Sequence, residues 1–356
     1  MRIVVKVGTS TLAHSTGRLN IQRMERFCKV LSDLKNMGHE IILVSSGAIA
    51  MGFGKLNLSE RPQDTPTKQA SAAVGQCELM YIYDKLFTEY NHTVAQLLIT
   101  APDIEEGGSR RENFHNTLAR LLELGALPII NENDTISVTV LMFTDNDELS
   151  GLVAAMMGAE ALVILSNIDG IYDGSPSDPA SQVIRRVAPG RDLSQYIDTA
   201  RSSRGRGGMT TKSRISSRAA GEGIEVVIAN GRRDNILTDL ILTDRDVVCT
   251  RFEAAPRPAS GVKKWIASSE GFAKGALHLD AGAAAAVSQS KAASILAVGV
   301  TAVEGDFERD DIVRILSPEG APLGVGRISC DSATARRNLG RKGLKPLIHC
   351  DYLYLE

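Results

Sequence analysis

The sequence is poor in the residues that build disulfide frameworks and transition-metal sites. Its 356 residues include only five cysteines and six histidines. The cysteines show no CxxC spacing and the histidines no HxxxH or HExxH pair, which argues against disulfide-rich folds, zinc knuckles and metalloprotease sites. We therefore expect no transition-metal site, and we expect the cysteines to be small core residues or idle thiols.

Long apolar runs and an excess of charge of one sign are also lacking. No stretch approaches the roughly 18 apolar residues that a membrane span needs, and the apolar run at the N-terminus is too short for a signal peptide and is interrupted by Lys6. Lys and Arg number 40 against 42 Asp and Glu, so no strong field draws the whole molecule to nucleic acid or anionic lipid. We expect a cytoplasmic protein with no membrane partner.

What the sequence does contain is an alternation of short β-branched runs and longer helical patterns. The runs in the first 250 residues are IVVKV, EIILVSS, TVAQLLIT, LPIINEN, ALVILSN and EVVIANG. Near-continuous apolar strands are buried on both faces, as in a parallel sheet. Helices are expected between them over 21–37, 66–89, 110–124 and 146–157. The pattern predicts an α/β domain with an open, mostly parallel sheet sandwiched by helices.

The character of the chain changes near residue 253. The segment EAAPRPASG is rich in proline, serine and glycine, as interdomain linkers are. Beyond it, short apolar runs and glycine-bounded turns predict a small, mostly β domain, with one alanine-rich helix near residue 283. We expect a catalytic domain at 1–252, a linker at 253–264 and a second domain at 265–356.

Two polar, glycine-containing segments follow predicted strands of the first domain. KVGTS, residues 6–10, has Lys6 inside the strand and a glycine at the turn, which suggests phosphate binding or simply an edge-strand lysine. SSGAIA, residues 45–50, lies where a strand meets a helix of small residues. Backbone N–H groups at such a junction attract an anion, although a helix N-cap by Ser45 or Ser46 would need no ligand.

Two further segments carry the remaining chemistry. The clusters NEND (131–134) and TDND (144–147) bring together carboxylates and amides, which suits a metal ion or a substrate ammonium better than a solvated loop. In GRGGMTTK, residues 205–212, the glycines let backbone N–H groups approach a phosphate, and Lys212 can pair with it. The alternative is that this segment is a flexible surface loop. No GxxxxGK[ST] Walker loop occurs. Phosphoryl transfer requires groups that position the phosphate and neutralise its charge, usually with Mg²⁺. Two lysines, glycine-rich anion-binding turns and a carboxylate provide such groups here.

In their order and spacing, several of these motifs resemble the amino-acid kinase family, and within it the kinases that act on glutamate. The motifs are KVGTS, SSGAIAMG, KQASAAVGQ, RENFHNTLARLLELGALPIINEND, DNDELSGLVA, GIYDGSP and GGMTTK. The resemblance covers about residues 1–250. The tail resembles a PUA domain, a small β-barrel often found in RNA-modifying proteins, so RNA is implied as a candidate partner of that domain.

The resemblance implies transfer of the γ-phosphoryl group of ATP, as its Mg²⁺ complex, to the γ-carboxylate of L-glutamate. The product would be glutamyl 5-phosphate, in the first step of proline biosynthesis, with proline as a feedback inhibitor and a homo-oligomer as the assembly. It also implies roles for residues. Catalysis would fall to Lys6, Lys212 and Asp147, with Asp147 holding the two lysines in position. Glutamate would be bound by Ser46, Gly47, Asp134, Asp145 and Asn146. ATP would contact Lys6, Gly8, Ser166, Asn167, Arg206, Gly207, Gly208, Met209, Thr210, Thr211 and Lys212.

Some positions depart from the family pattern: Thr-Asp is common in place of Ser166-Asn167, and Thr in place of Arg206. Two alternatives also stay open. N-acetylglutamate kinases and phosphate-accepting kinases share the paired lysines, but the NEND and DND clusters favour an acceptor with a free ammonium. The second alternative is an RNA-binding protein with a degenerate kinase fold, using the basic residues of 336–345. Retention of both lysines and of Asp147 argues against it, and residues 253–356 hold 13 basic and 12 acidic side chains.

Overall fold

The computed structural model describes residues 1–14, 16, 18–60, 62–100, 103–104, 108–136, 146–176, 178–193, 196, 209–243, 245–256, 273–289, 294–309 and 311–355. The chain divides into two compact units. One comprises Met1–Ala101 and Thr117–Pro258, and the other comprises Pro102–Asn116 and Ala259–Glu356. The division after Pro258 lies inside the expected linker, while the domain limits themselves stay a prediction.

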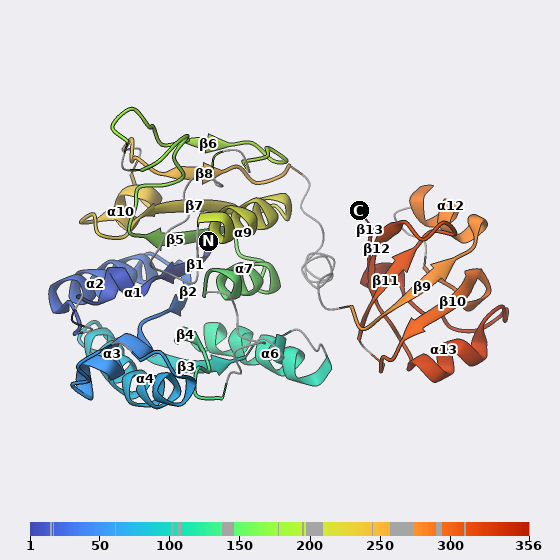
Figure 1. The fold of residues 1–356 in the computed structure, drawn as a ribbon, viewed down its shortest axis with the longest axis horizontal. Coiled ribbons are helices and arrows are strands. Elements are labelled where there is room, and N and C mark those ends of the chain that lie inside the picture. The colour runs from blue at the N-terminus through green and yellow to red at the C-terminus, as the bar shows by residue number, and fades with distance from the viewer. Residues whose placement is uncertain are drawn as a thin grey trace. The chain divides into compact units, whose positions relative to one another are not determined.

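The first unit is built on an eight-stranded sheet with the order β3-β4-β2-β1-β5-β7-β8-β6 (Figure 1). Its strands are β1 (Arg2–Val7), β2 (Glu40–Ser45), β3 (Val94–Ile99), β4 (Leu127–Glu132), β5 (Ala161–Ser166), β6 (Arg186–Val187), β7 (Glu225–Asn230) and β8 (Thr250–Phe252). All neighbours pair in parallel except β7 and β8, which are antiparallel. The mostly parallel α/β sheet predicted from the sequence is confirmed.

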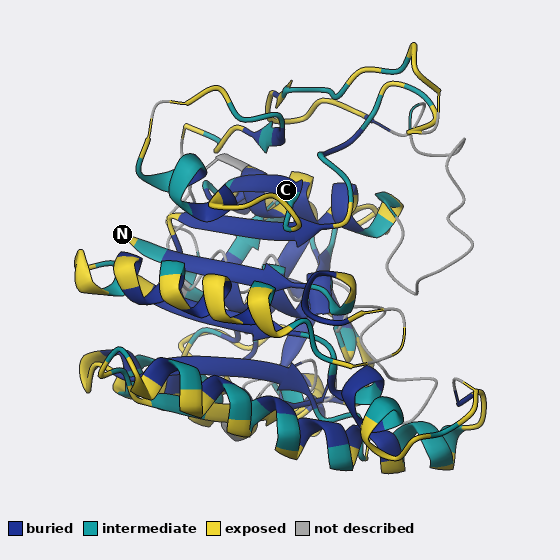
Figure 2. Cartoon of the chain, turned by 90° about the vertical axis from the view of Figure 1, so that its left-hand side faces the viewer, coloured by how far each residue is buried: buried dark blue, intermediate teal, exposed yellow. Residues whose placement is uncertain are grey.

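Helices cover both faces of this sheet. They are α1 (Thr9–Leu12), α2 (Ile21–Asn36), α3 (Ala48–Lys55), α4 (Thr65–Thr88), α7 (Asn146–Met156), α9 (Met209–Gly221) and α10 (Ile236–Ile241). A further helix, α6 (Gly108–Glu123), belongs to the second unit up to Asn116 and to the first unit from Thr117. Helices α1 to α4 and α10 lie on one face, and α7 and α9 lie on the other (Figure 1). Figure 2 shows the strands buried behind helices that expose only their outer stripes.

The central strand β1 presents its two faces to different surroundings, because successive side chains of a strand point to opposite sides. Ile3, Val5 and Val7 belong to the hydrophobic core that includes α2. Lys6 therefore points to the other face, toward α7 and α9. The edge-strand alternative for Lys6 is wrong, since β1 lies between β2 and β5.

Helices α3 and α4 pack against each other at two glycines. A Cβ at Gly75 would lie 1.8 Å from the backbone oxygen of Ala48, and one at Gly52 would lie 1.7 Å from that of Ser71. Both distances are shorter than any real Cβ contact, so the two helix backbones approach this closely only because these positions lack side chains.

The second unit contains a five-stranded sheet with the order β10-β9-β11-β12-β13. Its elements are β9 (Gly275–Leu279), α12 (Ala281–Gln289), β10 (Val300–Gly305), β11 (Ile312–Leu316), β12 (Pro322–Arg327), α13 (Ser332–Asn338) and β13 (Leu353–Leu355). Leu277, Val313, Ile315 and Ile348 are central to its separate core. The small β domain and the alanine-rich helix are confirmed. Among the described residues, no helix is both long and apolar enough to cross a bilayer.

Candidate active site

Two buried lysines share one buried aspartate on the face of the sheet covered by α7 and α9. Nζ of Lys6 lies 2.7 Å from Oδ1 of Asp147, and Nζ of Lys212 lies 2.7 Å from Oδ2 of the same carboxylate. The exposed fractions are 3% for Lys6, 0% for Asp147 and 8% for Lys212. The three predicted catalytic residues, separated by more than 200 positions along the chain, are therefore in direct contact.

Local structure explains why these three side chains meet. Lys6 comes from the central strand, while Asp147 and Lys212 lie in the first turns of α7 and α9. The two helices pack closely because α7 has Gly151 at their contact, where a Cβ would lie 2.6 Å from Cγ2 of Ile215. The first turn of a helix favours a carboxylate, so Asp147 is further stabilised by the α7 dipole.

The charge balance of this cluster suits an anionic ligand. Two ammonium groups and one carboxylate leave a net positive charge in a region where water is largely excluded. Burying charge is costly unless it is paired and hydrogen-bonded, and the pairs with Asp147 offset part of that cost. The remaining positive charge can stabilise negative charge that develops on a transferring group, as preorganised charges do in enzyme active sites.

A network of amide side chains adjoins the cluster through Asn146, the residue before Asp147. The Asn146 amide nitrogen donates to Oγ of Ser46 at 2.8 Å and lies 2.9 Å from Oδ1 of Asn131. It also lies 3.3 Å from the backbone oxygen of Ser45. In the described part of the chain the buried Oδ1 of Asn146 accepts no hydrogen bond. That oxygen therefore keeps the capacity to accept a hydrogen bond from a donor such as a ligand N–H.

Two members of this network, Asn131 and Gln76, are not among the residues singled out from the sequence. The amide nitrogen of Asn131 donates to Oε1 of Gln76 at 2.9 Å, and Oδ1 of Asn131 accepts from the backbone N–H of Glu132. Asn131 is therefore fixed with its oxygen toward Asn146. Gln76 lies in the KQASAAVGQ motif on α4, and Asn131 is the first residue of NEND. Their presence in these motifs is the feature of the sequence that could have identified them as site residues.

At the junction between β2 and α3, the structure contradicts the alternative that Ser45 or Ser46 caps the helix. The N-cap of α3 is Gly47, which has a φ of 116° and makes no side-chain cap. Neither Ser45 nor Ser46 caps the helix, because the hydroxyl of Ser45 lies 2.8 Å from that of Tyr83 and Ser46 accepts from Asn146. Burial raises the pKa of Tyr83, so this phenol stays protonated. The first backbone N–H groups of α3 therefore lack a side-chain cap and suit an anion.

The other predicted site residues fall around the same edge of the sheet. Gly8 directly follows β1, and Asp134 is half-buried in the turn after β4. Ser166 ends β5, and its hydroxyl lies 3.4 Å from Oδ1 of Asn167. Met209, Thr210 and Thr211 lie with Lys212 in the first turn of α9. Asp145, Arg206, Gly207 and Gly208 lie outside the described residues, so their assignments stay predictions.

Comparison with known proteins agrees with this geometry. The model of the amino acid kinase family matches residues 1–230. The chain belongs to the amino acid kinase family. A PUA domain model matches residues 275–347. This assigns the eight-stranded unit to a kinase family and the small sheet to a domain type of its own.

The similar members of this family include two that align over the full length. A glutamate 5-kinase of Bacteroides thetaiotaomicron is 53% identical over 357 residues, which is 100% of this chain and 98% of that protein. A glutamate 5-kinase of Chlorobaculum tepidum is 42% identical over 356 residues, covering 99% of this chain and 97% of the other. Among solved structures, a product complex of isopentenyl phosphate kinase from T. acidophilum aligns with a TM-score of 0.50 and 14% identity, over 71% of this chain and 100% of that one. That likeness concerns the fold alone.

Proposed function

We propose that the chain phosphorylates the γ-carboxylate of L-glutamate with ATP, yielding glutamyl 5-phosphate and ADP. The observation that carries the proposal is the buried pairing of Lys6 and Lys212 with Asp147 beside the amide network of Asn146. The full-length similarity to glutamate 5-kinases supports the choice of acceptor.

The reaction depends on positioning and charge neutralisation by this cluster, and no covalent intermediate with the protein is required. A γ-carboxylate oxygen of glutamate forms a bond to the γ-phosphorus of ATP, while the bond from that phosphorus to the bridging oxygen breaks and ADP leaves. Negative charge is spread over the moving phosphoryl oxygens during transfer. Lys6 and Lys212 neutralise that charge, and Asp147 holds both ammonium groups without taking part in proton transfer.

Glutamate binding is assigned to the amide network and its neighbours. Asn146 offers its Oδ1 to the α-ammonium of the substrate, and Asp134 supplies negative charge for the same group, with Asp145 as a further acceptor. Ser46 and the backbone at Gly47 bind a carboxylate. A charge-assisted hydrogen bond of this kind is about twice as strong as one between neutral groups, so the free ammonium contributes strongly to selectivity.

The ATP phosphates are assigned to the turn at Gly8 and to the loop and helix start at 206–212. Among the described residues, no three His, Cys, Asp or Glu side chains gather where they could hold a metal ion. Mg²⁺ commonly binds through one or two carboxylates together with substrate phosphates rather than in an all-protein cage. We therefore treat Mg-ATP as the substrate, with the ion carried by its phosphates.

An acceptor panel tests the proposed function. Acyl phosphate formed from glutamate, N-acetylglutamate and glutarate is trapped with hydroxylamine and measured beside ADP release. Glutamate should react, while the other two, which lack a free ammonium, should be poor acceptors. Reaction of N-acetylglutamate at a similar rate would contradict the proposal and favour the acylated-substrate relatives.

The wider role rests on the chemistry of the product. An acyl phosphate is an activated acid, and this one fits the first step of proline synthesis in the cytoplasm. Inhibition by proline and assembly into a homo-oligomer remain proposals of the family resemblance. RNA binding by the basic residues of 336–345 also rests on the resemblance of the second domain alone; α13 ends at Asn338, so these residues do not share one helix face.

A further inference from the structure

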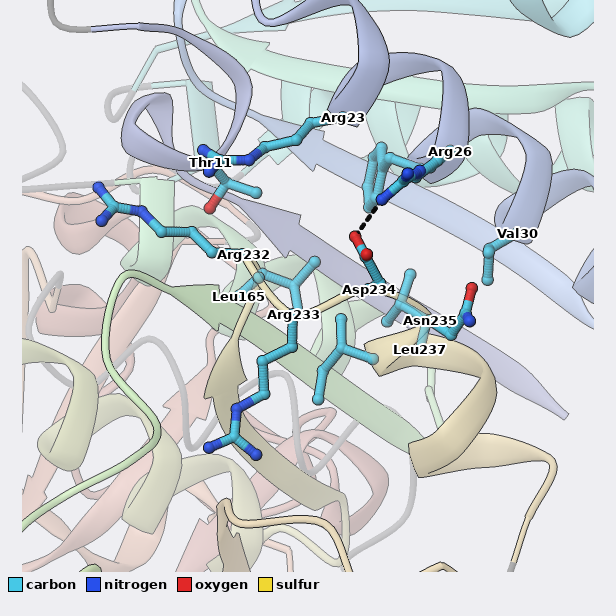
Figure 3. Close-up of a pocket in the computed structure, with 13 residues that line it drawn as sticks. Thr11, Arg23, Arg26, Val30, Leu165, Arg232, Arg233, Asp234, Asn235 and Leu237 are labelled. Atoms are coloured by element: carbon cyan, nitrogen blue, oxygen red, sulfur yellow. Dashed lines mark hydrogen bonds and ion pairs between the residues drawn. The ribbon is translucent and has the colours of Figure 1, made fainter.

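A pocket lined by charged side chains lies at the same edge of the sheet, outside the site described above. It is lined by the first turn after β1, by α2, by the end of β5 and by the segment between β7 and α10 (Figure 3). Its polar and charged lining residues include Thr11, Arg23, Arg26, Arg232, Arg233 and Asp234.

This pocket and the lysine cluster lie on opposite faces of the sheet. Leu165 lines the pocket and belongs to the hydrophobic core on the α2 face. Its neighbour Ser166 and the alternating residue Lys6 on β1 point the other way, as the pleat of a strand requires. A ligand in the pocket would therefore contact neither Asp147 nor the two lysines. No residue assigned above to glutamate or ATP lines it.

The positive charge of the pocket is only partly balanced. Arg26 pairs with Asp234, and Arg233 lies 3.0 Å from Oδ1 of Asp169. Arg23 and Arg232 form no ion pair with any carboxylate in the described part of the chain. In Figure 3 their guanidinium groups extend to the side of the pocket where Thr11 lies.

Thr11 supplies an independent sign of a missing partner. Its side chain is 3% exposed, and its Oγ1 has no hydrogen-bond partner among the described residues. It is held close to the β7–α10 segment, since a Cβ at Gly231 would lie 3.0 Å from that oxygen. A buried hydroxyl without a partner costs free energy, and such groups in folded proteins are nearly always satisfied by protein, water or ligand.

We propose that this pocket binds a phosphate group, held by Arg23, Arg232 and the hydroxyl of Thr11. Guanidinium groups are suited to phosphate because their planar donors match pairs of its oxygens. Two arginines from separate elements and one hydroxyl would contact several oxygens of a tetrahedral anion, whereas a carboxylate offers only two. Arg26 and Arg233 are already paired with Asp234 and Asp169, so the phosphate is assigned to Arg23 and Arg232 instead. Inorganic phosphate and a phosphomonoester present the same group.

The test is calorimetric titration of the full chain with inorganic phosphate, in parallel with glycerol phosphate. The variants Arg232→Gln and Arg23→Gln probe the pocket, and Thr11→Val removes only the hydroxyl. Arg120→Gln, an exposed helical arginine paired with Glu123, is the matched control for loss of a surface charge. Lys212→Ala separates the pocket from the catalytic cluster, which can also attract phosphate.

Phosphate should bind wild type, Arg120→Gln and Lys212→Ala with similar affinity at this site. Each of Arg232→Gln and Arg23→Gln should weaken binding by about 10-fold or more, the effect of losing a charge-assisted hydrogen bond. Tighter binding of glycerol phosphate supports an esterified ligand, and equal binding supports free phosphate. If Lys212→Ala abolishes binding while the pocket variants bind normally, phosphate occupies the catalytic cluster and the proposal is wrong. Absence of binding to wild type would also overturn it.

Discussion

At the scale of single residues, Asp147 is the group on which the site depends. It is fully buried, and each of its carboxylate oxygens lies 2.7 Å from a lysine nitrogen. Without that carboxylate, two ammonium groups would face each other in a region of low dielectric constant. Asn146 directly precedes Asp147. The first turn of α7 therefore positions both the two lysines and the amide network.

The charge of Asp134 tests the assignment of the acceptor. Asp134→Asn keeps the size of the side chain but removes the charge that would meet the substrate ammonium. The KM for glutamate should rise by about 10- to 100-fold, the range of a charge-assisted hydrogen bond, while the KM for ATP changes little. Steady-state kinetics with each substrate varied in turn measures both. An equal loss of affinity for ATP would assign Asp134 to the nucleotide side or to the fold.

Gln76 tests whether the amide network positions Asn146. Gln76→Leu removes the acceptor of the Asn131 amide, so Asn131 loses the bond that fixes its orientation. We expect the KM for glutamate to rise by about 3- to 10-fold, near the value of one neutral hydrogen bond, with kcat and the KM for ATP nearly unchanged. Gln76→Glu, which keeps an acceptor at this position, should restore most of the affinity. A fall in kcat alone would contradict a positioning role.

At the scale of elements, much of the first unit was predictable from the sequence. Strands β1, β2, β3, β4, β5 and β7 have six residues each and coincide with the mostly apolar runs of the sequence, and their ends fall within one residue of the expected limits. Strands β6 and β8 have two and three residues, which is too short for a periodic signal. The order of the strands was not predictable, because it depends on how helices pack across the sheet. The lack of a hydrogen-bond partner for the buried Oδ1 of Asn146 was not predictable either.

The contact between α3 and α4 gives an element-scale prediction for stability. Gly75→Ala would drive a methyl group into the backbone of α3, and overpacking of this kind typically costs about 1–3 kcal/mol. Urea unfolding should show a lower midpoint. The control is Gly221→Ala at the end of α9, where a Cβ meets nothing within 4 Å and where alanine should be neutral or slightly stabilising. Equal stability of the two variants would show that the helices can separate without cost.

At the scale of the whole molecule, the two units have separate cores. The core of the first unit includes Val5, Leu31 and Val227, and that of the second includes Leu277 and Val313. A unit with its own core can in principle fold alone. The linker composition pointed to this division, but sequence patterns gave no measure of how far activity depends on the second unit.

Truncation tests the independence of the first unit. Phe252 on β8 is buried, so the chain should end after Pro256 rather than inside β8. The shortened protein should fold, as measured by circular dichroism and a cooperative unfolding transition, and should retain measurable kinase activity. A folded but wholly inactive fragment would mean that the second unit contributes to the active site.

The most direct test of the central claim compares Lys6→Ala and Lys212→Ala with wild type in steady-state kinetics. We propose that both lysines act on charge that develops during phosphoryl transfer. Each variant should therefore lose about 100-fold or more in kcat, comparable to removing one oxyanion donor, with a much smaller rise in the KM for glutamate. Circular dichroism should confirm that both variants are folded. Near-normal kcat in the two folded variants would contradict a role of these lysines in phosphoryl transfer.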